Sequence, residues 1–125
     1  MNYLLQRVES FGGFVILTTN LDTSIDPALR RRLSGHVVFA TPDRDERKAL
    51  WRTMLAKKAP LASDLDFDAL ADEFADMTGA NIRNAVIAAA FFAAATGANA
   101  ISQRHMLHAG RREYRAMGRV LARRI

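Results

Sequence analysis

Two groups of side chains near the N-terminus could together bind a phosphate group. Asn20 follows the apolar run FVIL at residues 14–17, and its amide offers both a hydrogen-bond donor and an acceptor. Arg30, Arg31 and Arg32 follow shortly afterwards, and each guanidinium presents a planar fork that matches phosphate. Because ligands of open parallel sheets bind just outside the carboxyl ends of the strands, this order predicts a phosphate site.

The elements expected to position these side chains are a buried strand and a short helix. An unbroken apolar run fits a parallel strand that is buried on both faces, here over about 14–18. Asp26 and Pro27 suit the N-cap and the first position of a helix. We expect this helix over about 27–33, with the three arginines at its end.

A further helix and a further strand are expected on either side of this stretch. Residues 2–11 place apolar side chains on one face of a helix, and the pair Gly12-Gly13 ends it. The run HVVF at residues 36–39 predicts a second short strand. Thr41-Pro42 then marks a boundary in the chain.

Four helices are expected after this boundary. Capping residues begin them, and apolar stripes that recur every three or four residues define their buried faces. The expected helices run from Asp43 to about Lys57, from Asp66 through Met77, from Ala80 to Thr96, and onward from Ser102. The third is small and apolar on nearly every side, which predicts the buried central helix of a bundle.

The composition excludes several kinds of site. The chain of 125 residues has no Cys, so it can form neither a disulfide nor a thiolate metal site. It begins without the pattern of a signal peptide, and its longest strongly apolar run, residues 85–95, is shorter than the roughly 18 residues of a membrane span. We therefore expect a cytoplasmic location and no membrane contact. The net charge of +5 suits nucleic acid, nucleotide or acidic protein partners.

Three segments of the chain resemble the AAA+ ATPase family. VILTTN at residues 15–20 is similar to the sensor 1 strand, and IDPALRRRL at residues 25–33 is similar to the arginine-finger segment. TGANIRN at residues 78–84 is similar to the sensor 2 turn. The segments follow the family's order, and the resemblance covers nearly the whole chain but only the back half of an AAA+ module.

The resemblance implies roles for individual side chains. Asn20 would orient the attacking water or contact the terminal phosphate, and Arg83, in the first turn of its helix, would report the nucleotide state to the lid. Arg32 is the first candidate and Arg31 the second for a finger that reaches a neighbouring subunit's nucleotide, a contribution on the order of 10³ to 10⁵ in rate. Arg30 departs from the family's usual small or apolar residue, so the choice among the three stays open. The alternative is that these cations only complement the dipole at a helix C-terminus.

The resemblance also implies a mainly α chain in two parts. Residues 1–40 would be the C-terminal remnant of a P-loop nucleotide-binding domain, ordered as helix, short strand, short helix and short strand. Residues 41–125 would be the four-helix lid domain. In the family, a strand that this chain lacks lies between the two expected strands at about 14–18 and 36–39. These two strands would therefore pair directly, stay disordered or dimerise, and we expect self-association.

The sequence lacks the parts that would hold a nucleotide and its metal. The phosphate loop G-x-x-x-x-G-K-[ST] is absent, since none of Lys48, Lys57 and Lys58 follows a glycine. No apolar run ends in the acidic pair that holds Mg²⁺. We therefore expect ATP and Mg²⁺ in the complete protein only, and this chain alone should neither bind ATP tightly nor hydrolyse it.

The parent is expected to be a hexameric ring that hydrolyses ATP and remodels a protein complex, in the manner of bacterial chaperone-like or contractile-injection AAA+ proteins. One alternative is a DNA-related, clamp-loader-like protein. It would bind nucleic acid through a basic stripe on the last helix, made of Arg104, His108, Arg111, Arg115 and Arg119. A second alternative is a stand-alone helical interaction module without a nucleotide.

Overall fold

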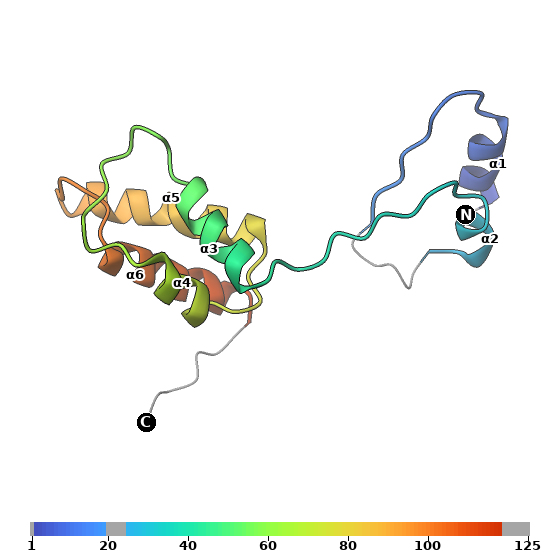
Figure 1. The fold of residues 1–125 in the computed structure, drawn as a ribbon. Coiled ribbons are helices and arrows are strands. Elements are labelled where there is room, and N and C mark those ends of the chain that lie inside the picture. Colours follow the sequence, from blue (N-terminus) through green and yellow to red (C-terminus); the bar gives the residue numbers. More distant parts are fainter. Residues whose placement is uncertain (1, 20–24, 119–125) are drawn as a thin grey trace. The chain divides into compact units, whose positions relative to one another are not determined.

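The computed structural model describes residues 2–19 and 25–118, which are mainly helical (Figure 1). The fold class is therefore confirmed as mainly α. The chain divides into two units, Met1–Phe39 and Ala40–Ile125, and the assignment of these parts to a nucleotide domain and a lid stays a prediction. The helices are α1 (Asn2–Ser10), α2 (Pro27–Arg30), α3 (Arg44–Thr53), α4 (Phe67–Glu73), α5 (Gly79–Ala95) and α6 (Gln103–Ala116).

The two predicted strands of the first unit are not confirmed. Residues 14–18 and 36–39 belong to no strand, and Phe14 is fully exposed. A strand is stabilised by hydrogen bonds to a neighbouring strand, and the one bridge in the described part of the chain lies elsewhere, between Leu61 and Ile101. Without sheet neighbours, an apolar run has neither a backbone partner nor a surface to cover it.

The short helix of the first unit begins as its sequence predicts. The Asp26 carboxylate accepts a hydrogen bond from the Ala28 amide at 2.8 Å, and Pro27 occupies the first helical position. The helix ends at Arg30, so it is shorter than the range 27–33 expected for it. Leu29 is the only buried side chain in the described part of this unit, at 5% exposure.

All four helices of the second unit begin at predicted N-caps, namely Asp43, Asp66, Thr78 and Ser102. Thr78 and Asn81 cap reciprocally: Thr78 Oγ1 accepts from the Asn81 amide at 3.3 Å, and Asn81 Oδ1 accepts from the Thr78 amide at 3.0 Å. These bonds satisfy amides that a helix start leaves without partners. Helix α3 ends at Thr53, before the predicted Lys57, while Leu55 beyond its end still reaches the core.

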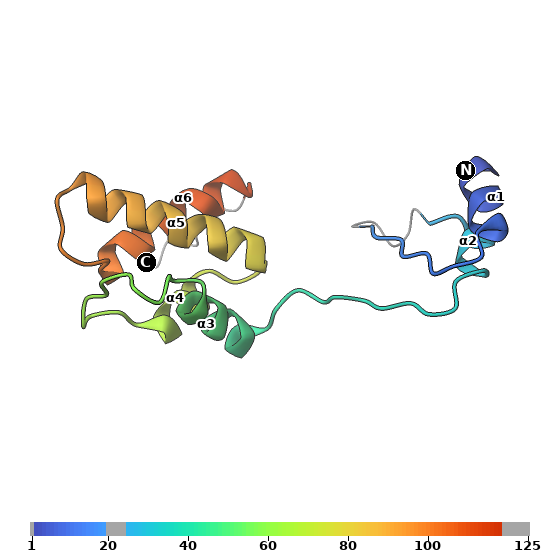
Figure 2. The same ribbon diagram turned by 90° about the horizontal axis from the view of Figure 1, so that it is seen from above.

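The core of the second unit lies between α3, α4, α5 and α6. Helix α5 lies alongside α6, and α3 packs on both α4 and α5 (Figures 1 and 2). The Phe74 ring lies between the rings of Trp51 and Tyr114, with centroids 5.8 Å away in each case. Gly110 makes room for it, because a Cβ there would lie 2.3 Å from a Phe74 ring carbon.

Two connections of the second unit are tied to each other. The segment between α3 and α4 meets the start of α6, where the Ala62 amide donates to the Ile101 carbonyl at 3.0 Å and the Ile101 amide donates to the Pro60 carbonyl at 2.9 Å. Gln103 extends the link, since its side chain accepts from the Asp66 amide at 3.0 Å. These contacts close one end of the helical unit.

Helix α5 is buried on one side only, so the expectation of a helix covered all round is wrong. Ile82, Ala85, Val86, Ala89 and Ala93 are buried, whereas Ile87 and Phe91 are 45% and 71% exposed. The helix is apolar on more sides than α3 and α6, which pack on it, can cover. Within the residues that the structure describes, no helix combines the length and apolar character needed to cross a membrane.

Candidate functional site

The predicted phosphate-reading residues are distributed over both units. Asn20 lies outside the described residues, so its proposed contact with a terminal phosphate stays a prediction. Arg31 and Arg32 follow α2 in the first unit, and Arg83 belongs to α5 in the second.

The two finger candidates after α2 have different partners. The Arg31 side chain donates from Nε to the Pro27 carbonyl at 3.3 Å, which is how a cation complements the C-terminal end of a short helix. The Arg32 guanidinium pairs with Glu9 of α1, and both side chains are about half exposed. Exposed ion pairs contribute only about 0–1 kcal/mol. Arg32 is therefore held in a way that a phosphate could replace at little cost.

Arg83 lies further along its helix than the sequence suggested. With Thr78 as the N-cap, α5 begins at Gly79, so Arg83 is past the first turn and past the amides that a helix start leaves free. The dipole penalty expected for a cation in the first turn is correspondingly weaker. Its side chain is exposed, and it makes no hydrogen bond or ion pair with the residues that the structure describes.

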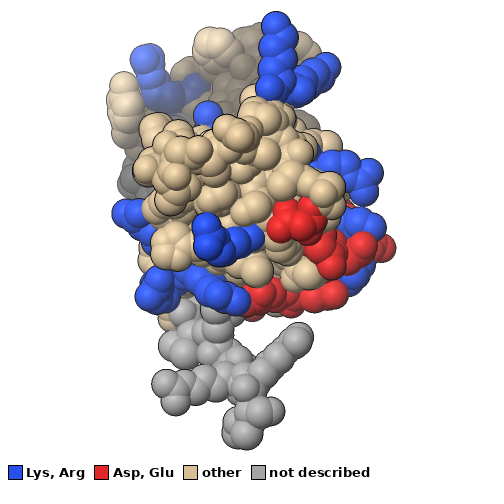
Figure 3. All heavy atoms as spheres, turned by 90° about the vertical axis from the view of Figure 1, so that its left-hand side faces the viewer, with Lys and Arg blue, Asp and Glu red and all other residues tan. Residues whose placement is uncertain are grey.

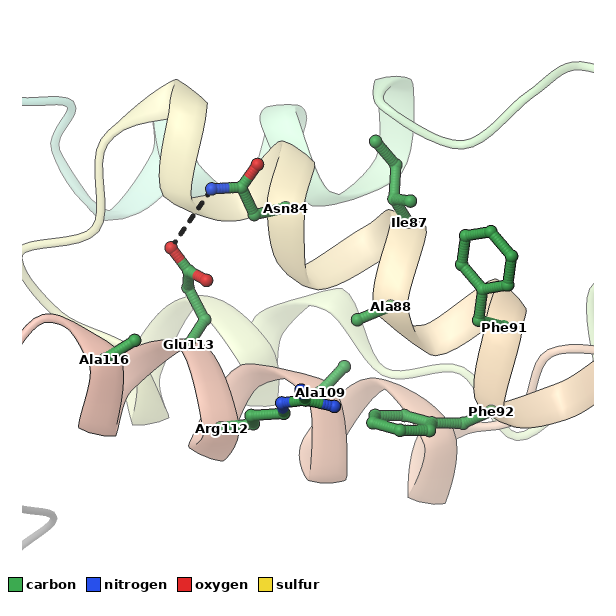
Figure 4. Close-up of a pocket in the computed structure, with 9 residues that line it drawn as sticks. All are labelled: Asn84, Ile87, Ala88, Phe91, Phe92, Ala109, Arg112, Glu113 and Ala116. Atoms are coloured by element: carbon green, nitrogen blue, oxygen red, sulfur yellow. Dashed lines mark hydrogen bonds between the residues drawn. The ribbon is translucent and has the colours of Figure 1, made fainter. Parts of the chain in front are cut away.

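A groove that the sequence reasoning missed runs between α5 and α6 (Figure 4). It has a volume of about 440 Å³. Alanines form its floor, Ile87 and Phe91 rise from α5, and Phe92 lies opposite Arg112 of α6. The lining residues are Asn84, Ile87, Ala88, Phe91, Phe92, Ala109, Arg112, Glu113 and Ala116. The feature of the sequence that could have indicated this groove is the excess of apolar residues on α5.

The one carboxylate in the groove is already engaged. Glu113 Oε1 accepts hydrogen bonds from the side-chain amides of Asn81, at 3.1 Å, and Asn84, at 3.3 Å. Arg112 instead lies over the Phe92 ring, with its guanidinium carbon 5.9 Å from the ring centroid. It has no carboxylate partner within residues 2–19 and 25–118.

A charged network that the sequence did not reveal joins α3 to α4. Arg44 donates to Asp68 at 3.0 Å and also to Asp72, while Lys48 pairs with the other oxygen of Asp68 at 3.1 Å. Hydrogen bonding by Arg44 lowers the pKa of Asp72, and hydrogen bonding by Lys48 and then Arg44 lowers the pKa of Asp68. Both aspartates in turn raise the pKa of Arg44.

The network continues into the backbone of α4. Arg47 donates two hydrogen bonds to the Ala71 carbonyl, at 3.1 and 3.2 Å, and one to the Pro42 carbonyl at 3.1 Å. Figure 3 shows one band of acidic side chains beside a wider spread of basic ones. The acidic residues around α4 therefore act within the fold, as partners of arginine and lysine side chains.

The basic stripe predicted on α6 is interrupted. Arg111 forms an ion pair with Glu73 of α4 at 3.2 Å, and the His108 ring meets the Phe92 ring edge-on at a centroid distance of 4.5 Å. Arg119 lies outside the described residues. The four described members thus do not form one continuous row of unpartnered cations, and the nucleic-acid alternative stays a prediction.

The residues of this chain do not fit the cradle of an ATP molecule. No phosphate loop occurs in the sequence, and within the described ranges no group of three or more His, Asp or Glu side chains could hold a metal ion. The chain does offer guanidinium groups that are exposed and weakly held. Exposed guanidinium groups of this kind can pair with phosphate.

Comparison with known proteins gives a family match over the second unit. Residues 43–116 match the contractile injection system ATPase helical domain. The chain is 39% identical over 109 residues to the ATP-dependent zinc metalloprotease FtsH 3 of Sphaerobacter thermophilus, with 82% of this chain and 22% of that protein covered. It is 37% identical over 109 residues to FtsH 1 of Conexibacter woesei, with 82% and 16% covered.

A eukaryotic relative matches a shorter stretch. The katanin p60 ATPase-containing subunit A1 of Strongylocentrotus purpuratus is 40% identical over 70 residues, which cover 56% of this chain and 13% of that protein. The chain thus spans less than a quarter of each of these relatives. Because the family match extends over more than half of the chain and over all of α3 to α6, the chain belongs to the AAA+ ATPases, in the family of the contractile injection system ATPase helical domain.

Proposed function

We propose that this chain supplies the helical lid and an adjoining nucleotide-reading segment of a protein that binds and hydrolyses ATP. The observation that carries the proposal is the family match over residues 43–116. A second observation extends it: an alignment over 82% of the chain is longer than residues 43–125, so it includes part of the first 42 residues. The similarity therefore reaches into the segment that holds the arginine cluster.

The relatives agree on ATP and differ in the rest of their names. Two are named ATP-dependent zinc metalloproteases, and the third is named an ATPase-containing subunit of katanin. The stretch shared with this chain is a small part of each. The family match of the shared stretch supports a role in the ATP-driven part.

The side chains proposed to read the nucleotide are Asn20, Arg32, Arg31 and Arg83. When bound in the complete protein, ATP supplies the phosphoryl group that is transferred to water. Arg32 stabilises negative charge on that group once it leaves Glu9, and Arg31 is the second candidate. Arg83 has an exposed guanidinium without a partner in the described structure, which suits contact with a phosphate on the side of the lid.

The finer parts of the proposal concern assembly and task. A finger that acts on a neighbouring subunit requires self-association, for which we propose a hexameric ring in the cytoplasm. The proposed task is chaperone-like remodelling of a protein complex. The family description, which refers to a contractile injection system ATPase, supports this direction.

A chimera tests the proposal directly. The stretch of this chain that aligns with the Sphaerobacter FtsH 3 protein would replace the matching stretch of that protein, and steady-state ATP hydrolysis would be measured. We expect the chimera to hydrolyse ATP, and Arg32→Ala to lower the rate on the order of 10³-fold or more. Arg30→Ala is the comparison within the arginine cluster: we expect a smaller loss there, and a loss as large as that of Arg32→Ala would move the finger to Arg30. A chimera that assembles yet hydrolyses no ATP would overturn the proposal.

A further inference from the structure

The groove between α5 and α6 has the surface of a docking site. Ile87 and Phe91 are spaced four residues apart on α5, so they project from the same side of the helix. Their exposed fractions are large for apolar side chains that sit side by side. The floor of the groove is formed by the small side chains of Ala88, Ala109 and Ala116. Small side chains between two helices allow a third helix to approach closely.

The net charge around this groove is positive, because three arginines surround the single carboxylate of Glu113. Glu113 is satisfied by two asparagine amides, whereas Arg112 has no carboxylate partner in the described structure. Arg115 lies one turn further along α6, is exposed, and likewise pairs with no described carboxylate. Arg83 adds a further positive charge on the α5 side, one turn before Ile87.

We propose that this groove binds an acidic amphipathic helix of a partner protein. The partner's aliphatic side chains would cover Ile87 and Phe91 and fill the space above the alanine floor. Its carboxylates would pair with Arg112 and Arg115 at the rim, where charge complementarity sets the orientation of the bound helix and rejects other partners.

Charge also argues against two other occupants. A second copy of this chain would bring a second set of the same three arginines into one interface, with only the two copies of Glu113 to oppose them, and an excess of like charge in an interface is costly. A nucleic acid would use the arginines but would have no need of the aliphatic wall at Ile87. The acidic helix is the occupant that uses both the apolar wall and the basic rim.

The experiment is a peptide selection on the full 125-residue chain. A phage library of random peptides of about 16 residues, roughly four helical turns, would be selected on the wild-type chain after depletion on Phe91→Ser. We expect enriched peptides to carry aliphatic residues at helical spacing with acidic residues beside them. The strongest peptide would then be synthesised with a fluorescent label, and its Kd measured by anisotropy.

Point variants sharpen the result. Phe91→Ser and Arg112→Glu should each weaken binding of that peptide about tenfold or more, while Arg104→Glu, a reversal on α6 outside the groove, should leave Kd within about twofold. Circular dichroism melts check that each variant folds, which is expected because both groove side chains lie outside the core.

Several outcomes would overturn the inference. These are enrichment of basic peptides, absence of any enrichment over the Phe91→Ser chain, or a Kd that Arg112→Glu leaves unchanged. Sedimentation that shows a dimer dispersed by Phe91→Ser would assign the groove to a second copy instead. Binding of labelled single-stranded DNA that persists in Phe91→Ser would assign the arginines to nucleic acid. The selection contains no ATP, so its outcome is independent of the proposed ATPase role.

Discussion

The two units of this chain differ in the burial of their large apolar side chains. In the second unit, Trp51, Phe74 and Met106 are fully buried in one core shared by four helices. In the first unit, Phe14, Ile16 and Phe39 are almost fully exposed. An amphipathic helix satisfies its own backbone and needs only a neighbour for one face, whereas a buried strand needs neighbours for its backbone and for both faces.

This difference shows which part of the chain is self-sufficient. Helices α3 to α6 pack on one another around a shared core. The first unit buries only Leu29 in its described part, and a contiguous exposed apolar surface marks a site of interaction. Its apolar segments are therefore candidates for an interaction surface.

The largest expected effect comes from separating the units. A polypeptide of residues 40–125 should keep a cooperative urea transition with the midpoint of the whole chain, while residues 1–39 alone should show none by circular dichroism, because they lack a core. Trp51 is the only tryptophan of the chain and is fully buried, so its fluorescence follows the second unit specifically. Loss of that transition in residues 40–125 would show that the second unit depends on the first.

Removing an aromatic ring from the core should destabilise the second unit by several kcal/mol, whereas a truncation in the first unit should not. Phe74→Ala should lower the free energy of unfolding by about 3–5 kcal/mol, because it empties the space between the rings of Trp51 and Tyr114. The control is Leu29→Ala in the first unit, which should leave the Trp51 transition unchanged within about 0.5 kcal/mol. A shift of that transition by Leu29→Ala would reveal coupling between the units.

A single added methyl group should test how closely the second unit is packed. Gly110→Ala places a Cβ 2.3 Å from the Phe74 ring, an overlap that should cost about 1–3 kcal/mol, partly offset by the better helix propensity of alanine. Gly79→Ala makes the same change where Leu50 and Met54 lie at an ordinary 4.0 Å. Urea unfolding should show a lower free energy of unfolding for Gly110→Ala and little change for Gly79→Ala.

The smallest expected effect is on the acid stability of the second unit. Because the folded-state pKa values of Asp68 and Asp72 are lowered, their contribution is present above about pH 4, the pKa region of an unfolded aspartate, and is lost as pH falls through the folded-state values. All these groups are exposed, so solvent screening keeps the effect small. Urea midpoints at about pH 5 and about pH 3, roughly one unit either side of that region, should differ less in Arg44→Gln than in the wild type.

The sequence was most informative where the interactions are local. The caps at Asp43, Asp66, Thr78 and Ser102 involve residues within one turn, and local motifs of this kind are readable without a structure. Contacts such as Arg44 with Asp72 or Arg47 with Ala71 join α3 to α4 across the fold. They have no local signal and could not be predicted.

The candidate site was less predictable than the fold for two physical reasons. The predicted strands depend on sheet neighbours that this chain does not provide, so residue pattern alone could not settle their conformation. The groove depends on which side of α5 stays uncovered, and this follows from how three other helices pack. The structure places Arg31, Arg32 and Arg83 on exposed surfaces, and α5 begins at Gly79, one residue before the expected Ala80.

Asn81 performs two tasks with one side chain. Its oxygen accepts from the Thr78 backbone, while its nitrogen donates to Glu113 of α6. The start of α5 is thus joined to the last turn of α6, and α5 cannot rotate about its own axis without releasing the bond to Glu113. A push delivered at this end would move the two helices together as one lever arm.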